Sequence, residues 1–112
     1  MRERRKYVRF PLVANVKYSH LNKPEEEKEC LSIDLSAVGI KLCLKKALPI
    51  GERLKVSFTL PVDSTPILVE GRVSWTIERG SDKTEVGIEF MKISDEDREK
   101  IINYVKRCLT WD

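Results

Sequence analysis

The stretch Ile67-Leu-Val-Glu-Gly-Arg-Val-Ser-Trp-Thr-Ile77 has an apolar residue or a glycine at every second position. A repeat of two residues is the period of a β-strand with one buried and one solvated face. Trp75 has the same parity as Val69 and Val73, so we expect its ring in the core. This stretch predicts a long β-strand and sets the pattern for the chain around it.

Five further segments show the same alternation. Their in-phase apolar residues are Leu12, Ala14, Val16 and Tyr18; Leu31, Ile33 and Leu35; Ile40, Leu42 and Leu44; Leu54, Val56, Phe58 and Leu60; and Val86, Ile88 and Phe90. Proline, glycine or charged residues separate them, as in residues 49–52, 61–66 and 80–83. Short strands divided by such turns predict an antiparallel β-barrel or sandwich.

The period of the pattern changes after Ser94. A serine here can cap a helix N-terminus, and the next three residues are acidic, which the helix dipole favours. Apolar residues then follow at helical spacing: Ile101, Ile102, Val105, Cys108 and Leu109. We therefore expect one amphipathic C-terminal helix that caps a barrel mouth, packs on the barrel side or binds a partner.

The composition fits one folded domain with a charged surface, because 41% of the 112 residues are hydrophobic and 35% are charged. Three cysteines, Cys30, Cys43 and Cys108, are far apart and form no C-x-x-C pair, so we expect reduced thiols. No apolar run approaches the ~20 residues that span a bilayer. The basic N-terminus lacks the apolar stretch of a signal peptide. We expect a cytoplasmic location without membrane insertion.

Positive charge is concentrated at the N-terminus. Residues 1–10 contain five Lys or Arg and one Glu, a net charge of +4, whereas the whole chain is +3, so the rest sums to −1. A protein that binds a nucleic-acid polymer spreads its cations along a phosphate track. A small barrel for single-stranded RNA or DNA also needs several aromatics on one polar face. Only Tyr7 and Phe10 lie among the cations, so a compact anion is the expected ligand.

Two segments offer complementary ligand chemistry. The arginine-rich segment 4–9 supplies guanidinium groups for phosphate or base edges, and Asp34 supplies a carboxylate acceptor for N–H donors. If the first two strands, residues 12–19 and 28–35, form a hairpin, the chain returns to the end of the sheet at which it entered. The sequence therefore predicts one composite site at that end.

These segments contain a known two-part signature at Arg5, Arg9, Asp34, Ser36 and Gly39. Arg-x-x-x-Arg followed by Asp-x-Ser-x-x-Gly at this distance resembles the signature of PilZ domains, bacterial receptors for the second messenger cyclic di-GMP. The likeness extends to residues 71–73, to residues 86–90 and to the C-terminal helix, and it covers essentially the whole chain. It implies an all-β fold with one C-terminal helix, built as a six-stranded antiparallel β-barrel.

The resemblance also implies roles for the signature residues. The two arginines would bind phosphate or guanine, and Asp34 would accept guanine N–H groups or orient an arginine. The Ser36 hydroxyl would donate or accept a hydrogen bond at short range. Gly39 would permit a positive φ and close approach of the ligand. Trp75 is a secondary candidate at the edge of the site.

The same resemblance divides the chain into two parts. Residues 1–11 would form a flexible arginine-rich arm that closes over the ligand, and residues 12–112 would form the barrel with its helix. A basic residue at the position of Arg4 is associated in PilZ-like domains with a stacked pair of nucleotides. We therefore expect two cyclic di-GMP molecules per chain and a change of shape that a downstream protein effector receives.

The sequence has no catalytic constellation. It lacks a nucleophile–base pair, a phosphate loop and a metal-ligand cluster, and His20 is its single histidine. We expect a binding module that is not an enzyme and that needs no cofactor or metal. The alternative is a PilZ-like adaptor that binds a protein partner without nucleotide, although the intact signature counts against it.

Overall fold

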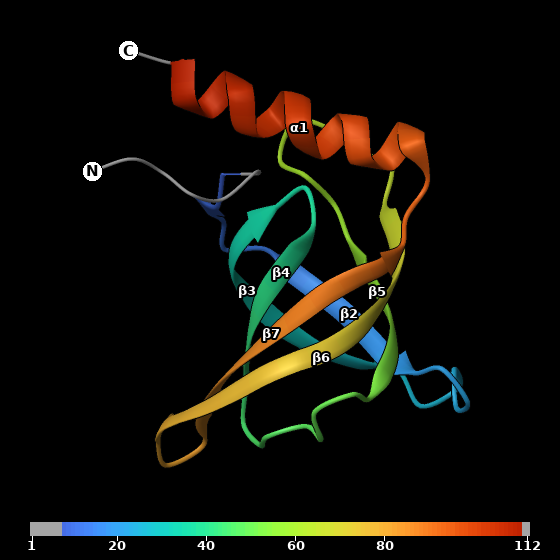
Figure 1. Cartoon of the computed structure of the whole chain (residues 1–112), viewed down its shortest axis with the longest axis vertical. Helices are drawn as coiled ribbons and strands as arrows, with labels where there is room; N and C mark the ends of the chain where they lie inside the picture. Colours follow the sequence, from blue (N-terminus) through green and yellow to red (C-terminus); the bar gives the residue numbers. More distant parts are fainter. Residues whose placement is uncertain (1–7, 111–112) are drawn as a thin grey trace.

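The computed structural model describes residues 8–110, which fold into strands followed by one helix (Figure 1). The elements are β1 (Phe10–Pro11), β2 (Asn15–His20), β3 (Lys28–Ser36), β4 (Gly39–Leu44), β5 (Arg53–Phe58), β6 (Ile67–Gly80), β7 (Lys83–Lys92) and α1 (Asp95–Thr110). The predicted order of strands and helix is confirmed.

Strands β2 to β7 close into a barrel. Hydrogen-bonded neighbours follow the order β3-β2-β5-β6-β7-β4, and β4 pairs again with β3. All of these pairs are antiparallel. The predicted six-stranded antiparallel barrel is therefore confirmed, and the sandwich alternative is wrong. The two-residue strand β1 is an addition that lies beside β3.

The first predicted strand, residues 12–19, is shorter in the structure, where β2 begins at Asn15 and the short strand β1 lies before residue 12. β1 pairs with the C-terminal half of β3, β2 pairs with its N-terminal half, and residues 12–14 connect them. Between them the buried Ser32 hydroxyl accepts from the Ala14 N–H at 3.0 Å and donates to the Leu12 carbonyl. β1 and β2 thus follow β3 in line, which brings Phe10 and Pro11 beside the end of β3, as the hairpin prediction required.

A β-bulge in β6 overturns the predicted face of Trp75. Val73 pairs with Ile88 and faces the core, but the next register pair is Trp75 with Gly87. Ser74 is therefore an extra residue, and its hydroxyl donates to the Gly87 carbonyl at 3.2 Å. One extra residue shifts the two-residue period by one step. Trp75, predicted to be in the core, is consequently half-buried on the outer face.

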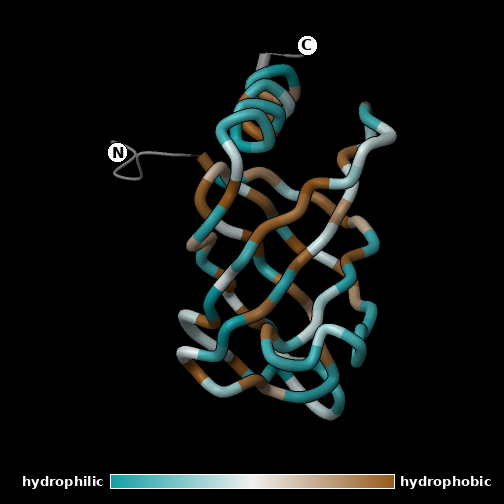
Figure 2. The backbone as a smooth tube through the Cα atoms, turned by 90° about the vertical axis from the view of Figure 1, so that its right-hand side faces the viewer, coloured by the Kyte–Doolittle hydropathy of each residue, from teal (hydrophilic) through white to brown (hydrophobic). Residues whose placement is uncertain are grey.

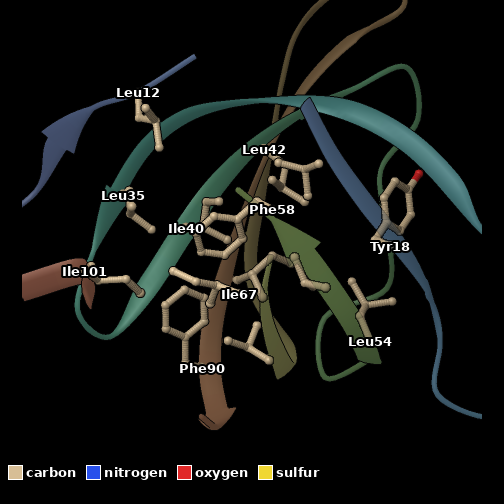
Figure 3. Close-up of a cluster of buried hydrophobic side chains, with 14 of the residues drawn as sticks. Leu12, Tyr18, Leu35, Ile40, Leu42, Leu54, Phe58, Ile67, Phe90 and Ile101 are labelled. Atoms are coloured by element: carbon tan, nitrogen blue, oxygen red, sulfur yellow. The ribbon is translucent and has the colours of Figure 1, made fainter. Parts of the chain in front are cut away.

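The barrel interior is filled by the in-phase apolar side chains, which converge from the strands in Figure 3. Phe58 and Phe90 stack with ring centroids 6.4 Å apart. Figure 2 shows the hydrophobic and hydrophilic residues alternating along the strands, with the helix across one end of the barrel. Ile101 of α1 is fully buried there, and such burial contributes about 1.5–3 kcal/mol. Of the three placements left open for the helix, the cap over a barrel mouth is confirmed.

The predicted helix start is also confirmed. The Asp97 N–H donates to Ser94 Oγ at 3.0 Å, and three acidic residues lie in the first turn. About one turn after Ile101 in α1, the ring of Tyr104 meets the ring of Phe10 edge-on, with centroids 6.3 Å apart. Because Phe10 directly follows Arg9, the helix packs on the residue next to a signature arginine.

Candidate ligand-binding site

The structure brings the described parts of the two sequence segments together. Pro11 of β1 is the register partner of Asp34 in β3, so the chain just before β1 passes the Asp34 side chain. Nη1 of Arg9 donates to Oδ1 of Asp34 at 3.0 Å. The Arg9 side chain is 34% exposed and the Asp34 side chain 16%, so the pair lies at a partly shielded surface.

The turn between β3 and β4 explains Ser36. This residue is only 2% exposed, and its Oγ accepts a hydrogen bond from the Val38 N–H at 3.2 Å. The Val38 carbonyl in turn accepts from the Phe90 N–H of β7 at 2.9 Å. Ser36 therefore fixes the loop between β3 and β4 and its contact with β7, and with it the end of the strand that holds Asp34.

Gly39 is required for close packing. A Cβ atom on Gly39 would lie 2.6 Å from the Ile88 carbonyl oxygen, a backbone atom that cannot rotate away. The expected positive φ at Gly39 is wrong, because among the described glycines only Gly51 and Gly80 adopt one. The close approach is thus to strand β7, which a β-carbon would push away from β4.

A row of register partners crosses five strands on the outer face of the barrel. The order is Pro11 in β1, Asp34 in β3, Lys41 in β4, Gly87 in β7 and Trp75 in β6. Register partners point to the same face of a sheet, so the signature carboxylate and the tryptophan belong to one continuous surface. We call these five residues the outer row.

Lys41 lies at the centre of the outer row. Its Nζ is 3.3 Å from Oδ2 of Asp34 and 3.7 Å from Oε1 of Glu85, and Arg79 lies 3.4 Å from the same Glu85 oxygen. Lys41 was not predicted from the sequence. The alternating pattern of the strand could have indicated it. Lys41 lies between Ile40 and Leu42, which are buried, so its side chain is expected on the outer face, two residues after Gly39.

Gly87 makes room for Trp75 on this face. A Cβ on Gly87 would lie 2.2 Å from indole atoms, so the ring occupies the space above the glycine backbone. Nζ of Lys41 is 5.9 Å from the Trp75 ring centroid, within the range of a cation–π contact. Trp75 therefore lies on the outer face, with its ring over the Gly87 backbone and beside Lys41.

Away from the outer row, three features of residues 8–110 bear on other kinds of site: the Cys30 thiol, the metal-ligating residue types and a surface hollow. Burial, and secondarily the neighbouring Cys43, raises the pKa of the Cys30 thiol to about 12, so this thiol is protonated at neutral pH and a poor nucleophile. No group of three His, Cys, Asp or Glu residues within 8–110 could hold a metal ion. A hollow of about 600 Å³ lies by the start of β3 and the end of β4, at the far end of that hairpin from Gly39.

The PilZ domain family matches residues 3–107 of the chain. The chain belongs to this family. No helix in the described part of this PilZ domain is long and apolar enough to cross a membrane.

Similar solved structures share the fold of this PilZ domain. MotI (DgrA), an inhibitor of motility from Bacillus subtilis, is 30% identical with a TM-score of 0.82 over 96% of this chain and 52% of that one. The PilZ domain of Escherichia coli YcgR, solved with c-di-GMP, is 16% identical with a TM-score of 0.72 over 96% and 95% of the two chains. Our chain thus spans about half the length of MotI. A comparison with curated proteins gives no match.

Two of the predicted site residues fall beyond the described range. Arg4 and Arg5 lie in residues 1–7, outside the described residues, as does most of the expected arm. The last two residues of that arm, Phe10 and Pro11, form β1. Of the remaining candidates, Arg9, Asp34 and Trp75 are on the outer face, whereas Ser36 and Gly39 support the turn beside them.

Proposed function

We propose that this PilZ domain is a receptor for cyclic di-GMP that binds the nucleotide on the outer row and responds by a change of shape. The observation that supports this most is the Arg9–Asp34 ion pair, which joins the two halves of the signature at one partly shielded place. The proposed ligand contacts are Arg4, Arg5, Arg9, Asp34 and Trp75, while the signature residues Ser36 and Gly39 hold the turn beside them. Related PilZ domains solved with c-di-GMP support the choice of nucleotide.

The chemistry of these groups suits the ligand. Cyclic di-GMP has two phosphates and two guanines. A guanidinium can donate two parallel hydrogen bonds to phosphate oxygens or to O6 and N7 of guanine. A carboxylate complements the N–H donors on the other edge of guanine, and an indole ring offers a stacking surface of about 1–3 kcal/mol per base.

Binding on this site would exchange existing contacts for new ones. Arg9 and Asp34 already satisfy each other. On binding, Arg9 must therefore exchange Asp34 for an anionic or acceptor group of the nucleotide, and Asp34 must exchange Arg9 for a donor. Phe10 and Pro11 are attached directly to Arg9, and Phe10 contacts Tyr104 of α1. Movement of Arg9 is thereby linked to the helix, which offers a route to a downstream protein effector in the cytoplasm.

A protein-binding adaptor without nucleotide is the second candidate. The observation in its favour is that Arg9 and Asp34 close the site on themselves at 3.0 Å. MotI, an inhibitor of motility, is more similar in sequence to this chain than YcgR is. An adaptor of this kind would bind its partner equally well with or without cyclic di-GMP.

Calorimetric titration with cyclic di-GMP distinguishes the two functions. The receptor predicts saturable binding that GTP and an RNA oligomer do not reproduce at equal phosphate concentration. No heat and no thermal stabilisation with cyclic di-GMP at millimolar concentration would contradict the receptor and leave the adaptor.

A further inference from the structure

We infer that Lys41 positions the Asp34 carboxylate to read guanine and thereby sets the base specificity of the site. This inference rests on the proposed function and adds a residue outside the PilZ signature. It starts from the contacts of Asp34, whose two oxygens have different cationic partners. Arg9 holds Oδ1 at 3.0 Å, and Lys41 holds Oδ2 at 3.3 Å.

The two cations have different freedom to leave the carboxylate. Arg9 lies just before the short strand β1, and its side chain is 34% exposed. Lys41 lies within β4, which pairs with β3 on one side and β7 on the other, and its side chain is 23% exposed. When Arg9 turns to the nucleotide, Lys41 stays on Oδ2. Asp34 then presents one free oxygen in a fixed orientation.

Lys41 is itself held from its opposite side. Glu85 Oε1 is 3.7 Å from Nζ, and Arg79 is 3.4 Å from that same oxygen. The Trp75 ring centroid lies 5.9 Å from Nζ. These partners come from β6 and β7, whereas Asp34 comes from β3, so Lys41 spans the row between the carboxylate and the indole. Glu85 and Asp34 side chains are each less than a fifth exposed, which limits screening by water.

A fixed, ionised carboxylate distinguishes guanine from adenine. The Watson–Crick edge of guanine presents two adjacent N–H donors, whereas the ring nitrogen at the same place in adenine is an acceptor that a carboxylate repels. Loss of Lys41 would free Asp34 to rotate after Arg9 departs and would leave its charge uncompensated. The guanine contact would weaken, and the preference over adenine would fall with it.

The test is a double-mutant cycle read by cyclic di-GMP affinity and by selectivity over cyclic di-AMP. Lys41→Met should weaken cyclic di-GMP binding about five- to tenfold and reduce the selectivity by a similar factor. In an Asp34→Asn background the same change should cost less than about twofold, because a positioning residue acts through its partner. Lys41→Arg should restore both quantities to within about threefold of the wild-type chain.

A matched control separates position from net charge. Lys92 is a β7 lysine 4.0 Å from Glu70, away from the outer row, and Lys92→Met removes the same charge. It should leave affinity and selectivity within about twofold. Far-UV circular dichroism and thermal melts establish that each variant is folded, and Lys41→Gln, which also removes the charge, takes the place of Lys41→Met in the cycle if the latter is not folded.

Different outcomes overturn different statements. If Lys41→Met weakens binding equally in the wild-type and Asp34→Asn backgrounds, or leaves selectivity unchanged, the positioning role is wrong while the receptor function stands. If the wild-type chain shows no saturable cyclic di-GMP binding, the receptor function and the role of Lys41 are both wrong.

Discussion

Nη1 of Arg9 lies 3.0 Å from Oδ1 of Asp34, although the two residues are 25 positions apart in the sequence. Arg9 and Asp34 are therefore already satisfied by each other without nucleotide. The free energy of binding is then the difference between two sets of charge-assisted contacts. A variant of either residue removes the ion pair as well as a ligand contact, so stability and affinity must be measured together.

Arg9→Ala should weaken cyclic di-GMP binding by about tenfold or more, because one charge-assisted contact contributes about 1.5–3 kcal/mol. The free energy of unfolding should change by less than about 1 kcal/mol, because a partly exposed ion pair contributes little. Titration calorimetry and thermal melts measure the two quantities.

The matched control for Arg9→Ala is Arg53→Ala. Arg53 of β5 pairs with Glu70 at 2.8 Å and is not part of the outer row. Its loss should not change affinity by more than about twofold. Equal affinity of Arg9→Ala and the wild-type chain would contradict the site.

Asp34→Ala separates a ligand contact from a structural turn residue. We expect a clear loss of affinity with a stability cost of about 1 kcal/mol or less, since Arg9 can turn to solvent and Lys41 keeps its contact with Glu85. Melting curves with and without nucleotide decide the matter. Severe destabilisation, with normal binding by the folded fraction, would assign Asp34 to the turn alone.

The sequence predicted most of the barrel but not the face of Trp75. Parity alone placed this ring in the core, because a bulge leaves no mark on an alternating pattern. Ser74, the extra residue, has a hydroxyl that bonds to the opposite strand, which is a tertiary contact. Lys41 was missed for a related reason. Its partners are on β3 and β7, and only the barrel order brings those strands to either side of β4.

Gly39→Ala should destabilise the fold. The added Cβ would approach the Ile88 carbonyl oxygen to 2.6 Å, so β4 and β7 must separate. We expect a loss of about 1–3 kcal/mol, as for overpacked sites. Val38→Ala in the same turn is the control, because Val38 is 41% exposed and its truncation should change the stability by less than about 0.5 kcal/mol. Equal melting temperatures for Gly39→Ala and the wild-type chain would refute the packing argument.

Phe10→Ala should uncouple nucleotide binding from the helix. Phe10 follows Arg9 and meets Tyr104 of α1 at 6.3 Å between ring centroids. In the wild-type chain we expect cyclic di-GMP to change amide hydrogen exchange in α1, because Arg9 moves with the residue that packs there. Phe10→Ala should reduce that change while binding stays within about threefold. Exchange in α1 that is indifferent to nucleotide in the wild-type chain would rule out this route.

The final prediction concerns how many nucleotides bind. Two cyclic di-GMP molecules have four phosphate charges, and residues 1–10 have a net charge of +4, so the segment can neutralise a stacked pair. Arg4 is one of these cations. Titration of the wild-type chain should therefore give two molecules per chain, and Arg4→Leu should shift the ratio towards one.

Hydrogen exchange across residues 2–10 should slow when the nucleotide is added. Arg53→Leu, which removes the same charge from β5, should leave the ratio at two. A wild-type ratio of one would refute the stacked pair without touching the role of Arg9 and Asp34, whereas slow exchange across residues 2–10 before any nucleotide is added would refute the ordering of the arm.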